Sequence, residues 1–163
     1  MDTTSYVIAL GSNRRGRHGA PEREVAAALA LLKPLAVAPL LPTEPIGPSI
    51  RRFANTAALI ETEESPPVLL RRLKAIERDF GRRRGQRWGA RVIDLDIVLW
   101  SEGAWNDAAL TIPHPQFRAR RFVLDPLEKL VPAWRDPLTR LTVRQLAARL
   151  RKPRPVDRMA LRA

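Results

Sequence analysis

The order in which short apolar runs alternate with helical patterns is the feature that most constrains the fold. Apolar runs at 6–10, 35–41, 53–62 and 92–99 have the length and character of strands. Segments 21–34 and 65–80 carry apolar residues at helical spacing and start near a proline, which the first turn of a helix tolerates. Strand, helix, strand, strand, helix, strand is the order of the ferredoxin-like pattern. We therefore expect an α+β fold with a ferredoxin-like βαββαβ core.

The chain beyond this core is expected to add an extra strand and two helices. Helical patterns cover 122–130 and 141–150, and either Thr139 or Thr142 could cap the second helix. We see no internal repeat and no linker, so we expect a single three-layer domain over 1–163. The basic, proline-containing stretch 151–163 is expected to be a flexible tail.

Composition narrows the class of protein. Of 163 residues, 45% are hydrophobic, which is too many for a disordered chain. No apolar run approaches the roughly 20 residues that a membrane span needs, and we find no secretory signal. Cysteine is absent, which excludes a disulfide framework and fits a cytoplasmic protein. The net charge of +12, carried mostly by arginine, favours a polyanionic partner, either a nucleotide or a nucleic acid.

The strongest local signal is the pair Asp94 and Asp96 within an otherwise apolar strand. Residues two apart in a strand project to the same face, so the two carboxylates lie side by side. Adjacent carboxylates repel each other, and Mg²⁺ is a natural partner because it prefers oxygen ligands. The alternative is the solvent face of an edge strand, where alternating aspartates are ordinary.

A basic segment leads directly into this strand. It holds Arg82, Arg83, Arg84, Arg87 and Arg91, with Trp88 among them. Arginines beside a metal-binding carboxylate pair are typical of polyphosphate sites. A solvated charged loop is the competing interpretation.

A histidine and two aromatic residues could also contribute to a site. His114 lies between two prolines and precedes an arginine cluster, although a lone histidine is more often structural. Phe53 and Asn55 share one strand face and could hold a flat heterocycle, whereas Phe53 and Phe122 could equally belong to the core. No Walker-type phosphate loop and no zinc-ligand spacing is present.

Several motifs together resemble those of the 6-hydroxymethyl-7,8-dihydropterin pyrophosphokinase family. The most specific is the run from Arg87 to Ile97, RWGARVIDLDI. Supporting matches, in the family's order, are Ala9–Asn13, Thr43–Gly47, Phe53–Asn55, Pro113-His114 and Arg120–Leu124. The resemblance extends from Tyr6 to about Leu150.

The resemblance implies transfer of a diphosphate from ATP, as co-substrate, to a pterin alcohol, and two Mg²⁺ ions bound by Asp94 and Asp96. The catalytic residues would be Arg82, Arg91, Asp94 and Asp96. Residues that bind ATP would be Glu77, Arg84, Trp88, Ile97, Thr111, His114 and Arg120. Residues that bind the pterin would be Thr43, Pro45, Ile46, Phe53, Asn55, Trp88, Asp94 and Phe122. It also implies mobile loops at 11–20, 43–52 and 81–90.

Two other functions compete with this one. A ferredoxin-like sheet with a charge of +12 could bind nucleic acid, but a carboxylate pair on its inner strands would repel a phosphate backbone. A catalytically silent scaffold is the second alternative, and the intact set Arg91, Asp94, Asp96 and His114 argues against it. We expect a monomer that binds small molecules, with no specific nucleic-acid ligand and no membrane.

Overall fold

The structure, a computed structural model, describes residues 2–43, 53–81 and 92–152. One antiparallel sheet has the strand order β2-β4-β1-β5, and a further strand, β3, also pairs with β4. The strands are β1 (Thr4–Ser12), β2 (Ala36–Val37), β3 (Leu41–Thr43), β4 (Phe53–Thr62) and β5 (Asp94–Trp100). The two long strands β1 and β4 form its centre.

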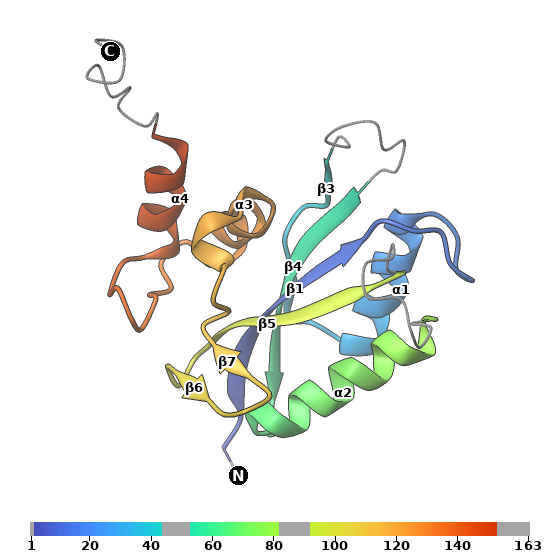
Figure 1. Cartoon of the computed structure of the whole chain (residues 1–163), viewed down its shortest axis with the longest axis horizontal. Coiled ribbons are helices and arrows are strands. Elements are labelled where there is room, and N and C mark those ends of the chain that lie inside the picture. The colour runs from blue at the N-terminus through green and yellow to red at the C-terminus, as the bar shows by residue number, and fades with distance from the viewer. Residues whose placement is uncertain (1, 44–52, 82–91, 153–163) are drawn as a thin grey trace, which may run out of the picture.

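Helices cover both faces of this sheet (Figure 1). On one face lie α1 (Pro21–Leu32) and α2 (Pro66–Asp79), and on the other lies α3 (Arg121–Leu130), against which α4 (Val143–Arg151) packs. A short 3₁₀ turn, η1 (Phe117–Ala119), precedes α3. Strands β6 (Trp105–Asn106) and β7 (Thr111–Ile112) form a separate two-stranded hairpin.

Alternating side chains of β1 supply two separate cores. Tyr6, Ile8 and Leu10 are buried against α1 and α2, while Val7 is buried on the α3 side. Strand β5 repeats this division, and its register against β1 shifts between Val7 and Ile8. Such a bulge changes the face that the following side chains occupy. Leu95 and Ile97 at the start of β5 therefore belong to one core, whereas Leu99 near its end belongs to the other.

The core elements lie close to where the sequence predicts them. The predicted strand 53–62 coincides with β4, and the predicted helices correspond to α1, α2, α3 and α4. The predicted strand 35–41 is instead divided into β2 and β3. Pro39 lies between the two and has no N–H to donate to a ladder, which explains the interruption.

The C-terminal part differs in detail from the expectation. In place of one extra strand on the sheet, the chain forms the β6–β7 hairpin. Thr142 caps α4 by accepting a hydrogen bond from the Gln145 N–H at 3.1 Å, and the Gln145 side chain bonds back to Thr142. Thr139, the other predicted cap, bonds Asp136 instead. The predicted tail lies outside the described residues from 153 on.

Among the helices of the described residues, none combines the length and apolar character that crossing a membrane requires.

Candidate active site

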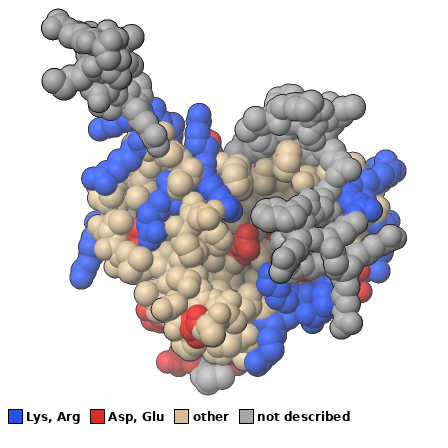
Figure 2. All heavy atoms as spheres, viewed as in Figure 1, with Lys and Arg blue, Asp and Glu red and all other residues tan. Residues whose placement is uncertain are grey.

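A cavity of about 510 Å³ opens where β1, β4 and β5 meet the segment that leads into α3. Seven residues predicted to form a site line it: Phe53, Asn55, Asp94, Asp96, His114, Arg120 and Phe122. Acidic atoms lie in a hollow near the centre of the face in Figure 2, with basic side chains to either side. The structure therefore brings together residues that span 70 positions of sequence, Phe53 to Phe122.

Asp94 and Asp96 project from β5 on the side of the sheet that carries the cavity. Their neighbours Leu95 and Ile97 are buried on the opposite side, so the alternation predicted for this strand is confirmed. In the antiparallel register, Asp94 is opposite Gly11 and Asp96 is opposite Ala9. These small residues of β1 leave space beside the two half-buried carboxylates.

Asn55 reaches the cavity from the other side of β1. It is opposite Gly11 in the β1–β4 register, so Gly11 lies between Asn55 and Asp94. A Cβ atom at Gly11 would lie only 2.9 Å from Asn55 Oδ1. The missing side chain at Gly11 thus allows the Asn55 amide its place. Phe53 lies two residues earlier in β4 and is half-buried on the same strand face.

His114 is held by backbone contacts on both sides. Its N–H donates to the Val98 carbonyl at 3.0 Å, and its Nδ1 accepts from the Gln116 N–H at 3.2 Å. The peptide bond between Ile112 and Pro113, just before it, is cis. Because Nδ1 accepts a hydrogen bond, the neutral ring carries its proton on Nε2.

Burial is the main influence on the ionisation of His114, and it lowers the pKa of the imidazole. Asp96 opposes this effect, and the nearby Arg120 adds to it, so that the pKa lies below its ordinary value. A neutral His114 can donate one hydrogen bond through Nε2 without adding a charge to the cavity.

Arg120 and Phe122 form the wall on the α3 side. The Arg120 guanidinium lies 5.6 Å from the centre of the Phe122 ring, and it also bonds the Gln116 side chain. Phe122 is 45% exposed, which is unusual for a phenylalanine. Two aromatic rings therefore border the cavity: Phe53, which is half-buried, and Phe122, which is exposed.

Three other predicted residues have side chains elsewhere. Glu77 is buried beneath β5, where its carboxylate accepts a hydrogen bond from the Leu95 N–H at 2.9 Å and pairs with Lys74 at 3.2 Å. Ile97 is part of the core beside α1 and α2. Thr111 is exposed on β7 and bonds Asn106. None of the three is among the residues that line the cavity.

The remaining predicted residues fall outside what the structure describes. The side chain of Thr43 is not described, although its backbone belongs to β3. The others lie in the gaps 44–52 and 82–91; they are Pro45, Ile46, Arg82, Arg84, Trp88 and Arg91. Their roles stay predictions, as do the mobile loops.

Eight lining residues were not predicted as site residues. They are Ala9, Leu10, Gly11, Ser12, Asn13, Thr56, Val98 and Val123. Most belong to the end of β1, whose motif Ala9–Asn13 supports the family resemblance but carries no charge to suggest a role. Only the pairing of β1 between β4 and β5 places this segment at the centre of the site.

The described residues contain no group of three or more His, Asp or Glu side chains arranged to hold a metal ion. Two carboxylates alone leave most of an octahedral Mg²⁺ shell to other oxygens. A site of this kind fits an ion that a phosphate-containing substrate shares.

The fold and the site place the chain among the mixed α/β proteins, and its described residues form a five-stranded antiparallel sheet with four α-helices. Solved structures titled Plasmodium falciparum HPPK-DHPS resemble the chain with a TM-score of 0.72 at 15% sequence identity. The match covers 91% of this chain and 41% of that one. At this identity the likeness establishes the fold.

The family is established by sequence. The model of the 7,8-dihydro-6-hydroxymethylpterin-pyrophosphokinase family matches residues 7–132, and the chain belongs to this family. A Synechocystis protein named 2-amino-4-hydroxy-6-hydroxymethyldihydropteridine pyrophosphokinase is 43% identical over 100 residues. That match covers 61% of this chain and 51% of the relative. A Pseudomonas aeruginosa protein of the same name is 40% identical over 148 residues, which are 86% of this chain and 89% of the relative. The chain thus spans about half the length of the first relative and most of the second.

Proposed function

We propose that this protein transfers a diphosphate from ATP to the hydroxymethyl group of 6-hydroxymethyl-7,8-dihydropterin, as in folate biosynthesis. The observation that supports this best is the composition of the cavity wall. The carboxylates Asp94 and Asp96 line it from β5, and Phe53, Phe122 and the Asn55 amide line it from β4 and α3. Carboxylates that can bind a metal ion, together with aromatic rings and an amide, suit a reaction between a nucleotide and a flat heterocycle.

The pterin ring would stack between Phe53 and Phe122. Both rings border the cavity, and stacking on a flat heterocycle uses the aromatic faces that partial exposure leaves accessible. Asn55 presents a donor and an acceptor, which match the amide-like edge of a pterin. Contacts from Thr43, Pro45 and Ile46 are part of the same proposal.

The triphosphate would lie between the carboxylates and the basic residues. Asp94 and Asp96 would hold two Mg²⁺ ions, which neutralise phosphate charge when bound. Arg120 and the Nε2–H of His114 would donate hydrogen bonds to phosphate oxygens from the opposite wall. Arg82, Arg84, Trp88 and Arg91 are proposed to complete the phosphate site.

The reaction balances without a covalent enzyme intermediate. The hydroxyl oxygen of the pterin attacks the β-phosphorus, and a new oxygen–phosphorus bond forms as the bond from the β-phosphorus to the bridging α,β-oxygen breaks. AMP leaves with that oxygen, and the hydroxyl proton is released. The protein contributes by orienting the two substrates and by stabilising charge on the transferred group.

Glu77, Ile97 and Thr111 would act on ATP less directly than the resemblance implies. Glu77 caps the edge of β5 at Leu95, between the two aspartates, and so would hold that strand in place. Ile97 and Thr111 would contact the nucleoside through backbone groups. These roles are proposals.

The deciding experiment measures AMP release from ATP and Mg²⁺, with and without the pterin alcohol. We expect AMP formation that requires the pterin, and we expect it to vanish in Asp96→Ala. A protein that forms no AMP under these conditions would refute the proposed function. Binding of RNA that weakens steeply with salt would then favour the nucleic-acid alternative.

The finer architecture is also a proposal. The order β2-β4-β1-β5 with α1 and α2 on one face supports a ferredoxin-like core. A single domain over 1–163, a monomeric state and a cytoplasmic location stay predictions. Size-exclusion chromatography with light scattering tests the monomer directly, because a dimer doubles the measured mass.

A further inference from the structure

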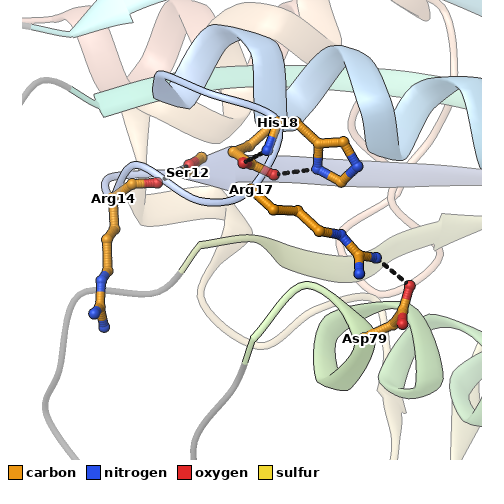
Figure 3. Close-up of polar contacts among 6 residues, drawn as sticks. Ser12, Arg14, Arg17, His18 and Asp79 are labelled. Carbon is orange, nitrogen blue, oxygen red and sulfur yellow. Dashed lines mark hydrogen bonds and ion pairs between the residues drawn. The ribbon is translucent and has the colours of Figure 1, made fainter.

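The loop that joins β1 to α1 is fastened by contacts that the proposed reaction does not use. Glu24, in the first turn of α1, is completely buried. Its carboxylate accepts hydrogen bonds from the His18 backbone N–H at 2.7 Å and from His18 Nδ1 at 2.8 Å, the two dashed lines at His18 in Figure 3. A buried carboxylate is costly unless it is hydrogen-bonded, so His18 is the partner that Glu24 requires.

The same loop is also fastened to the end of α2. The His18 ring lies 4.8 Å from the Phe80 ring, centre to centre, and the Arg17 guanidinium lies 5.9 Å from that ring. Arg17 pairs with Asp79 at 2.7 Å, as Figure 3 shows. The loop thus bridges the beginning of α1 and the end of α2.

Close packing at Gly16 adds a third segment to this junction. Gly16 and Gly19 exchange two backbone hydrogen bonds of 3.0 and 3.2 Å, which close a tight turn around His18. A Cβ atom at Gly16 would lie 2.5 Å from Glu24 Oε1 and 2.6 Å from Val92 Cγ1. Val92 stands two residues before Asp94, so the loop touches the chain just before it enters β5.

The other end of the loop forms part of the cavity. Ser12 and Asn13 line it, and the Ser12 hydroxyl donates a hydrogen bond to the Arg14 carbonyl at 3.3 Å. His18 and Glu24 do not line it. Any effect of this pair on the reaction must therefore pass through the loop.

We propose that the His18–Glu24 pair is a positioning device for the transfer reaction. The pair holds Ser12 and Asn13 of the cavity wall at a fixed distance from Val92, and hence from Asp94. This inference rests on the proposed function. Placement of this kind matters because a shift of about 1 Å at reacting groups can cost about 10²-fold in rate.

The test compares the wild type with His18→Leu and His18→Gln, with kcat and both KM values measured beside thermal unfolding. Leucine removes the side-chain donor to Glu24 and keeps the backbone N–H donor, whereas glutamine keeps a side-chain N–H as well. We expect His18→Leu to lower kcat about tenfold, and we expect His18→Gln to recover most of that loss. The KM for ATP should stay within about twofold of the wild-type value, because neither His18 nor Glu24 lines the cavity.

Two controls separate positioning from stability. Thr139→Val removes a 2.7 Å hydrogen bond to a different buried carboxylate, Asp136, and should lower Tm while kcat is kept. If His18→Leu fails to fold, His18→Phe retains a ring on Phe80 and loses both ring nitrogens, including the Nδ1 donor to Glu24, and it should show the same lower kcat.

The results distinguish a failure of the positioning role from a failure of the proposed transfer reaction. A His18 variant that lowers Tm as Thr139→Val does, with kcat unchanged, would overturn the positioning role and leave the proposed function standing. A wild-type protein that makes no pterin-dependent AMP would overturn both.

Discussion

The pair Asp94 and Asp96 and the single Asp136 are aspartates in opposite circumstances. Asp136 is completely buried and is bonded by Arg118, by the Thr139 hydroxyl at 2.7 Å and by the Leu138 N–H at 3.0 Å. Asp94 and Asp96 are half-buried beside a cavity. The difference teaches that a completely buried carboxylate bonded by several protein donors stabilises the fold, whereas half-buried carboxylates that line a cavity can also contact a substrate.

The ionisation of Asp136 follows from its partners. Burial alone would raise its pKa, but the hydrogen bonds from Arg118, Thr139 and Leu138 and the charge of Arg118 lower the pKa to about 2. Arg118 also lies 4.7 Å from the centre of the Phe117 ring. The Asp136 cluster thereby ties η1, which precedes α3, to the loop before α4.

The largest expected effect is the loss of activity in Asp96→Asn. The amide keeps the shape of the side chain but weakens its hold on a cation, and we expect kcat to fall at least about 10³-fold. The free energy of unfolding should stay within about 0.5 kcal/mol of the wild-type value, because one of two adjacent like charges is removed. Steady-state kinetics and urea unfolding check the two parts. A large loss of stability would mean that Asp96, like Asp136, stabilises the fold.

Asp136→Asn should lower the stability of the fold and leave the activity unchanged, the opposite of Asp96→Asn. It removes the charge that pairs with the partly buried Arg118, and we expect the free energy of unfolding to fall by roughly 3 kcal/mol. The kcat of the folded protein should be unchanged. Urea unfolding and kinetics at a temperature where the variant is folded provide the measurement, and a drop in kcat would show that the Asp136 cluster also serves the site.

Acid should reveal the contribution of Asp136 separately. Its folded pKa of about 2 lies below the ordinary 3.8, so its stabilisation is present above pH 4 and is lost as the pH falls from about 4 to 2. The loss should amount to roughly 2 kcal/mol. Chemical unfolding at several pH values should show a shallower decline in Asp136→Asn than in the wild type. Equal slopes would contradict the assigned pKa.

Gly11→Ala should weaken binding of the pterin substrate rather than destabilise the fold. The added Cβ atom would meet Asn55 Oδ1 at 2.9 Å and force the amide to move. We expect KM for the pterin to rise about tenfold, which corresponds to about 1.4 kcal/mol, with little change in KM for ATP. Ala9→Gly, which enlarges the same wall without a clash, is the matched control. An equal rise in both KM values would count against a pterin role for Asn55.

The smallest expected effect belongs to Arg17→Ala. The ion pair of Arg17 with Asp79 is more than half exposed on both sides, and exposed pairs contribute little. We expect Tm to change by less than about 2 °C. A larger change would mean that the contact of Arg17 with the Phe80 ring matters more than its charge.

The sequence predicted the elements that depend on local pattern. Local sequence is enough to predict the alternation in β5, the starts of α1 and α2 at prolines and the span of β4. Side-chain periodicity and proline geometry act over only a few residues. The resemblance of short motifs indicated the family, and the family match over 7–132 confirms it.

The contacts between distant segments were decided only by the tertiary structure. Glu24 is a charged residue in the first turn of α1, yet it is completely buried and accepts two hydrogen bonds from His18. Glu77, which the resemblance assigns to ATP binding, bonds the Leu95 N–H at the edge of β5, and its role toward ATP stays a prediction. Gly11 lies at the centre of the site because β1 pairs with β4 on one side and with β5 on the other. Local pattern encodes which face a residue occupies, but the partner across that face depends on chain packing at long sequence separation.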